Sequence, residues 1–307
     1  MRKLSAQFID DLLNSDGILH PILKRVKKDH TLMLAIRNNY LNIYYRGGNI
    51  LKLKEHNKGF YQASFDDQYN KSGQVIACCP DEIRIQNDAA SWVDSFSMRK
   101  NIMDEFFSTY GKAEREFQQL IARENNYSTI SNESEYFVSD IEVYEPYARF
   151  DIIAIRWLAR ERKNGSNCKV ALIEMKYGDA ALDGSAGILK HLEDMNTLIS
   201  AKDHYADLLQ TMESQFNQLD ELGLMKFSKG TSNAKVKLSP DEKPEVIFIL
   251  ANHNPRSQKL KQILCAPEID TYAESQLFDL KFYAASFAGY GLHEKCMLSL
   301  AEFRKLL

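Results

Sequence analysis

Two short segments of this sequence end in charged residues that could act together. The segments are residues 149–153 (RFDII), which contain Asp151, and residues 172–176 (LIEMK), which contain Glu174 and Lys176. An unpaired carboxylate buried in an apolar strand costs on the order of several kcal/mol, so charge at the end of such a strand needs a reason. Two carboxylates and one ammonium in a groove form a site for a divalent cation with a lysine beside it.

The context of Glu174 separates it from other acidic residues that precede a basic one. The same spacing occurs at residues 161–163, 241–243 and 279–281. Only residues 169–173 (KVALI) have the β-branched and apolar character of a buried strand leading directly into the triplet. Side chains alternate along a strand, so Glu174 and Lys176 should share one face.

A second apolar strand is predicted over residues 147–159, and the polar residues 160–167 connect it to the first. The connection contains Asn164-Gly165, the strongest short signal for a hairpin. Folding there makes the strands antiparallel and brings Asp151 to the level of Glu174. A register shift of one residue would turn Asp151 to the opposite face. The alternative is a strand pair whose charged ends simply reach solvent.

This hairpin resembles the metal site of the PD-(D/E)XK nuclease superfamily, the restriction-endonuclease-like fold. There, an Asp on one strand and Glu-x-Lys on the next follow a helix that carries another glutamate. Helical spacing of apolar residues predicts a helix between Arg99 and Glu124. Within it, residues 111–117 (GKAEREF) resemble the start of the archaeal Holliday-junction resolvases, and Glu114 then corresponds to an active-site glutamate. An ordinary solvated charge is the alternative for Glu114. Phe150 stands where the superfamily name has a proline.

The resemblance implies a metal-dependent nuclease that hydrolyses phosphodiester bonds, with DNA a more common substrate than RNA. Asp151, Glu174 and the Met175 backbone carbonyl would bind Mg²⁺ or Mn²⁺. Lys176 would orient the attacking water, and Glu114 could hold a second metal or a bridging water. The alternative is a catalytically silent, nuclease-like module that binds nucleic acid or a protein partner. The oligomeric state is left open, a homodimer included.

The predicted fold is α/β, with a restriction-endonuclease-like core in which helices flank a central mixed β-sheet. Residues 1–95 are predicted to form an N-terminal β-rich region, with a short helix and an antiparallel meander between residues 31 and 69. Residues 96–307 are predicted to form the catalytic domain, including a long helical stretch over 188–222, strands at 246–251 and 281–287, and a helix over 294–307. Aromatic residues of the meander could stack on bases, but cross-strand packing is the simpler interpretation.

Composition fits an ordinary globular enzyme: of 307 residues, 44% are hydrophobic and 26% charged. The net charge of −3 argues against indiscriminate coating of nucleic acid, but phosphate affinity depends on local charge and metal. No apolar run approaches the roughly 18 residues of a membrane span. Lys190 and His191, early in the long helical stretch, are interpreted as helix-surface residues. Five cysteines without metal-ligand spacing predict reduced thiols and a cytoplasmic location, namely Cys78, Cys79, Cys168, Cys265 and Cys296.

Overall fold

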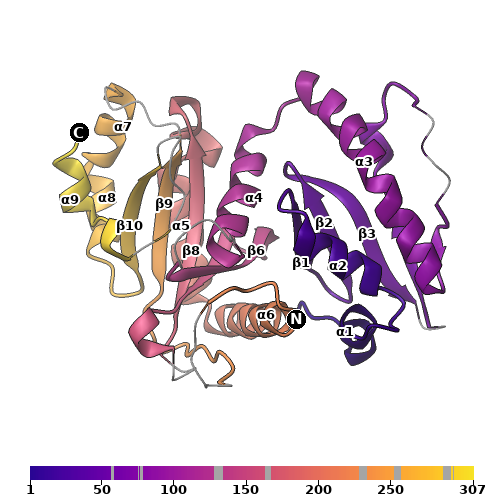
Figure 1. Cartoon of the computed structure of the whole chain (residues 1–307). Coiled ribbons are helices and arrows are strands. Elements are labelled where there is room, and N and C mark those ends of the chain that lie inside the picture. Colours follow the sequence, from indigo (N-terminus) through magenta and orange to yellow (C-terminus); the bar gives the residue numbers. More distant parts are fainter. Residues whose placement is uncertain are drawn as a thin grey trace. The chain divides into compact units, whose positions relative to one another are not determined.

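Two β-sheets organise the part of the chain that the computed structural model describes (Figure 1). One compact unit consists of residues 1–123 and 218–225, and the other of residues 124–217 and 226–307. The predicted Asn164-Gly165 turn and Cys78 lie outside the described residues. The structure describes residues 1–56, 59–74, 76, 79–127, 134–162, 167–227, 234–251, 257–285, 292 and 294–307.

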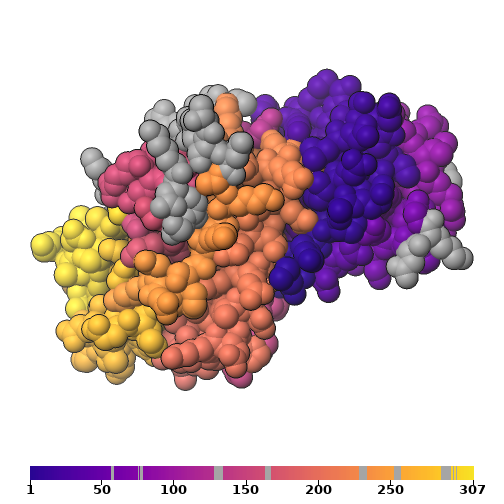
Figure 2. All heavy atoms as spheres, turned by 90° about the horizontal axis from the view of Figure 1, so that it is seen from below, coloured from indigo at the N-terminus to yellow at the C-terminus, as the bar shows by residue number. Residues whose placement is uncertain are grey.

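The first unit contains a five-stranded antiparallel sheet whose strands follow one another in chain order. Figure 2 shows these N-terminal residues as one group of indigo and purple spheres. The two-residue connection between the second and third strands, Arg46 and Gly47, has φ of 48° and 73°, which suits the right-handed twist of a tight hairpin. The strands are β1 (Leu32–Ile36), β2 (Tyr40–Tyr45), β3 (Gly48–His56), β4 (Phe60–Ser64) and β5 (Glu82–Ile83).

One face of this sheet is covered by helices, so its alternate residues form an apolar core. Tyr61 is buried on that face, with its ring 4.7 Å from that of Phe8 and its hydroxyl 2.5 Å from Asp11 Oδ2. The opposite face carries exposed polar residues such as Lys52 and Gln62. The predicted antiparallel meander is therefore confirmed. The helices are α1 (Ala6–Leu13), α2 (His20–Lys28), α3 (Gln86–Thr109) and α4 (Ala113–Asn126), which runs across the division between the units.

The second unit contains a mixed sheet of five strands in the order β10-β9-β8-β7-β6. Strands β6, β7 and β8 pair antiparallel, whereas β8, β9 and β10 pair parallel. Every residue of β9 is buried, as expected for a strand covered on both faces. The strands are β6 (Tyr136–Tyr144), β7 (Arg149–Arg156), β8 (Lys169–Tyr177), β9 (Glu245–Ala251) and β10 (Asp279–Ala285).

The helices of the second unit complete an α/β layer arrangement, which confirms the predicted mixed sheet flanked by helices. Helices α8 and α9 contact β10, and Figure 1 shows them beside it at the yellow end of the chain. None of the helices in the described ranges is long and apolar enough to cross a membrane. The helices are α5 (Ile188–Ser200), α6 (Lys202–Glu221), α7 (Gln258–Leu264), α8 (Pro267–Ala273) and α9 (Leu300–Arg304).

Several boundaries differ from the sequence prediction. The proposed division after residue 95 falls inside α3, all of which belongs to the first unit. The helix predicted between Arg99 and Glu124 is two helices, because the chain leaves helical geometry at Tyr110 before Gly111. The predicted helical stretch over 188–222 is formed by α5 and α6, which are separated at Ala201. Residues 294–307 contain a short 3-10 turn and only five α-helical residues.

Candidate active site

Asp151 and Glu174 lie opposite each other on neighbouring strands. The last paired rung between β7 and β8 joins Ile152 to Ile173, so the next positions along the two antiparallel strands are Asp151 and Glu174. Beyond that rung the Asp151 carboxylate replaces backbone pairing, because its Oδ2 accepts a hydrogen bond of 2.8 Å from the Met175 N–H. The end of the ladder is thus where the acidic side chain turns toward the neighbouring strand.

Lys176 lies on the same face of β8 as Glu174 and contacts it. Its Nζ is 3.3 Å from Glu174 Oε2 and donates a hydrogen bond of 2.8 Å to the Ala186 carbonyl. Ala186 ends a short 3-10 turn, Gly184–Ala186, in the loop that follows β8. The ammonium is 4% exposed, so strand and loop together hold it beside the carboxylates.

The two carboxyls are strongly desolvated, at 5% exposure for Asp151 and 1% for Glu174. Burial raises the pKa of Asp151, although the Met175 N–H and Lys176 oppose the shift. Burial and then the charge of Asp151 raise the pKa of Glu174 well above its usual range, against the effect of Lys176. The two side chains hydrogen bond to each other, which requires a proton on one of them. Both pKa directions oppose simultaneous ionisation of the pair.

His191 also faces this pair, which corrects its interpretation as a helix-surface residue. It lies on α5 with Nδ1 3.4 Å from Glu174 Oε2, and its side chain is 14% exposed. Burial, followed by the charge of Lys176, lowers the pKa of His191 to about 4, so the imidazole is neutral at pH 7. Lys190 does lie on the surface, where it pairs with Glu193 and Asp194.

The helical phase of α5 contained a usable signal for His191. The buried residues of this helix include Ile188 and Met195, which stand three before and four after His191. That spacing places all three on the side of the helix that faces the sheet.

Glu114 belongs to a different compact unit from the other candidate site residues. It stands in the first turn of α4 and is half-buried, within the first unit, whereas Asp151, Glu174 and Lys176 belong to the second. Its part in catalysis stays a prediction.

The donor atoms of the site fit a hard divalent cation. Oε1 of Glu174 is buried and accepts no hydrogen bond within the described residues. The Met175 carbonyl points to the same side of β8 as the N–H that bonds Asp151, because both groups of a strand residue face one neighbour. No set of three or more His, Cys, Asp or Glu side chains in the described ranges is arranged around a metal position. Mg²⁺ commonly binds through one or two carboxylates and completes its shell with water and substrate phosphate, so two carboxylates and one carbonyl suffice.

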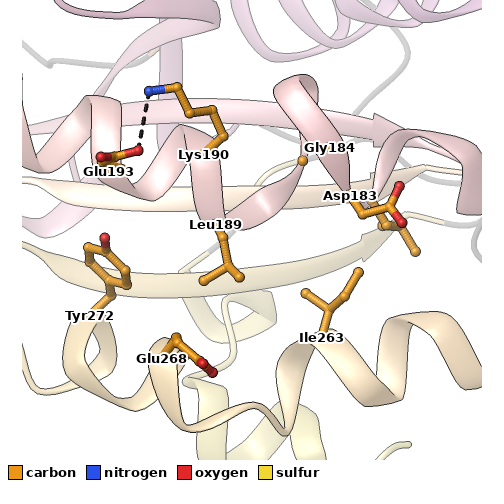
Figure 3. A pocket seen from close by; sticks show the side chains of 10 residues that line it. Asp183, Gly184, Leu189, Lys190, Glu193, Ile263, Glu268 and Tyr272 are labelled. Carbon is orange, nitrogen blue, oxygen red and sulfur yellow. Dashed lines mark hydrogen bonds and ion pairs between the residues drawn. The ribbon is translucent and has the colours of Figure 1, made fainter.

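A larger cavity of about 450 Å³ lies nearby, but its charge does not suit a polyanion (Figure 3). Leu189, Ile263 and Tyr272 line it, while its charged lining consists of Lys190 and three acidic residues. The Lys190 ammonium is already paired with Glu193, as the dashed line in Figure 3 shows. A smaller cavity of about 10 Å³ adjoins Lys176, enough for about one water. The three acidic residues of the larger cavity are Asp183, Glu193 and Glu268.

Comparison of the chain with family models, curated proteins and solved structures gives no match.

Proposed function

We propose that this chain is a divalent-metal-dependent nuclease with a restriction-endonuclease-like core. The observation that carries the proposal is the contact of two buried carboxyls from adjacent strands, Asp151 and Glu174, with the Lys176 ammonium 3.3 Å from Glu174. A buried acidic pair opposed by one ammonium keeps an excess of negative charge when both acids ionise. A bound cation would balance that excess and replace the shared proton.

The order of elements also supports the proposed core. Helix α4 precedes the antiparallel strands β6, β7 and β8, and helices α5 and α6 lead to the parallel strands β9 and β10. This is the order of helix, three strands, helix and two strands that the resemblance implies. DNA as the preferred polymer rests on the resemblance, with RNA as the second candidate.

The residues of the site would divide the reaction between them. When bound, Mg²⁺ would neutralise charge developing on the phosphate and lower the pKa of its water. Asp151 and Glu174 would hold the cation through carboxylate oxygens, with the Met175 carbonyl as the third protein ligand. Lys176 is fixed by the Ala186 carbonyl. From there its ammonium can donate to a phosphate oxygen and orient the attacking water.

A cleavage screen tests this function. Linear duplex, plasmid, single-stranded and branched DNA, together with RNA, are incubated with the wild-type protein and with Lys176→Met in Mg²⁺ or Mn²⁺. We expect cleavage of at least one substrate by the wild type, its loss in Lys176→Met, and metal binding in both. Lys190→Met, which removes an exposed ammonium, is the matched control and should cleave normally.

The same screen distinguishes a nuclease from the alternative of a catalytically silent binding module. Survival of every substrate with the wild-type protein, under conditions in which titration shows bound metal, would refute hydrolysis of nucleic acid.

A further inference from the structure

Exposed tyrosines surround the turn between β6 and β7, at the same end of the sheet as Asp151. The turn is closed by a hydrogen bond of 2.9 Å from the Glu145 N–H to the Ala148 carbonyl. Tyr144 is 58% exposed and Tyr147 44% exposed. Burying a large aromatic side chain usually stabilises a protein more than leaving it exposed to water. Two exposed rings beside a candidate active site therefore indicate a surface for a ligand.

Arg149 connects this turn to the carboxylates. It stands two residues before Asp151 on β7, so the two side chains leave the same face of the strand. The guanidinium carbon lies 4.9 Å from the centre of the Tyr144 ring. A cation and an aromatic ring are thus held together next to the candidate active site.

The backbone at this point is unusual. Glu142 has φ of 52° although it is not a glycine and lies within β6. Such a conformation is strained and persists where the surroundings fix it, most often near functional sites. Its carboxylate receives a hydrogen bond of 2.7 Å from Arg149. The strained residue therefore holds Arg149 in place beside the acidic pair.

We infer that the nuclease site engages nucleic acid whose nucleotides are unpaired beside the scissile phosphate, an inference that rests on the proposed function. Arg149 is placed to contact a phosphate of the strand, since guanidinium groups form paired hydrogen bonds with phosphate oxygens. Tyr144 and Tyr147 are placed to stack on bases. The ring of Tyr147 contacts the ring of His204, with 5.0 Å between their centres. Bases inside a duplex are already stacked and offer no free face, so such rings favour single strands, flaps or branch points.

Binding and cleavage are measured on one sequence in three forms: single-stranded, fully paired, and paired with an internal unpaired loop. Binding uses Lys176→Met in Mg²⁺, so that no strand is cut, and cleavage uses the wild-type Lys176. Tyr144→Ala and Tyr147→Ala are added to each background. Tyr144→Phe keeps the ring, and Tyr110→Ala removes an equally exposed tyrosine of the first unit as a control.

We expect single-stranded and looped substrates to bind and be cut at least about 10-fold better than the duplex, and each alanine variant to lose roughly 10-fold in affinity for them. Tyr144→Phe and Tyr110→Ala should leave that affinity unchanged. If the duplex binds as tightly as the single strand and neither alanine variant changes the affinity, the inference is overturned. Cleavage of that duplex would still leave the nuclease proposal standing. Binding that depends on both tyrosines without any cleavage supports the surface and refutes the enzyme.

Discussion

Replacing Asp151 by Asn should abolish metal-dependent activity while leaving the fold almost unchanged. Asp151 is 5% exposed, and its Oδ2 accepts the Met175 N–H at 2.8 Å. An asparagine has nearly the same shape, and its amide oxygen can accept the same hydrogen bond. We therefore expect the free energy of unfolding without metal to change by no more than about 1 kcal/mol. Asp151→Ala removes the acceptor, leaves a buried N–H without its partner and should cost about 1–3 kcal/mol.

The effect on metal binding should be much larger than the effect on stability. The site offers two carboxylates, so Asp151→Asn removes half of its anionic ligands. Changes to groups that only support a metal ligand weaken binding by about 10–100-fold, and loss of a ligand's charge should exceed about 100-fold. Cleavage at limiting Mg²⁺ should fall by at least the same factor. The one remaining carboxylate, Glu174, is paired with the Lys176 ammonium and attracts the cation less strongly.

Three measurements on the same samples separate these effects: calorimetric titration with Mn²⁺, cleavage of a labelled oligonucleotide, and unfolding in urea. Asp183→Asn is the matched control, because it removes a carboxylate that is 60% exposed on the loop after β8. Metal affinity and cleavage close to the wild-type values in Asp151→Asn, with the protein folded, would show that Asp151 is no metal ligand.

Three further outcomes are expected. His191→Leu should lower cleavage by roughly 10–100-fold without unfolding the protein, and His191→Gln should restore part of it, as measured in parallel cleavage assays. Tyr136→Phe should cost about 1.5–3 kcal/mol in urea unfolding, because its buried hydroxyl donates to the Glu245 carboxylate at 2.8 Å. Asp29→Asn should cost about 1–3 kcal/mol at pH 7: burial would raise the pKa of Asp29, but hydrogen bonds from Lys100 and others lower it overall. A lowered carboxyl pKa stabilises the fold above the unfolded pKa of about 3.9, and this stabilisation is lost as pH falls toward the lower folded pKa. The urea unfolding of variant and wild type should therefore begin to converge below about pH 4.

The common face of Glu174 and Lys176 was predictable from the sequence, because side chains alternate along β8. The position of Asp151 needed only the assumption of an antiparallel hairpin, and the structure places it next to Glu174. Arg149 stands two residues before Asp151 in the same strand. Its hydrogen bond to Glu142 could not be predicted, because Glu142 belongs to β6. Contacts of that kind come from a strand that must first be recognised.

Strand β6 itself was not recognised because polar residues interrupt its apolar pattern. Asp140 is fully buried in it, and its charge is accommodated by a hydrogen bond of 2.7 Å from Gln215 on α6. In the sequence alone, an acidic residue favours an exposed loop over a buried strand, because its distant hydrogen-bond partner cannot be identified. The predicted boundary after residue 95 falls inside α3. Helix α3 packs with α2, and tertiary contact between helices leaves no local mark at residue 95.

A second buried charge cluster in the same sheet shows what is particular about the candidate active site. Glu245, at the start of β9, is 4% exposed, accepts from Tyr136 at 2.8 Å and lies 3.3 Å from Arg156. Arg156 also lies 2.6 Å from Glu294, whose side chain is 41% exposed, so the second carboxylate of this cluster reaches water.

The pair of Asp151 and Glu174 lies toward the opposite end of these strands, and both of its carboxyls are buried. One ammonium opposes two carboxyls, a proton must be shared between them, and Glu174 Oε1 accepts no hydrogen bond within the described ranges. Buried groups left in this state cost stability, and folding alone gives no reason to keep them. Under the proposed function, a divalent cation would replace the shared proton and bind both carboxylates in their ionised form.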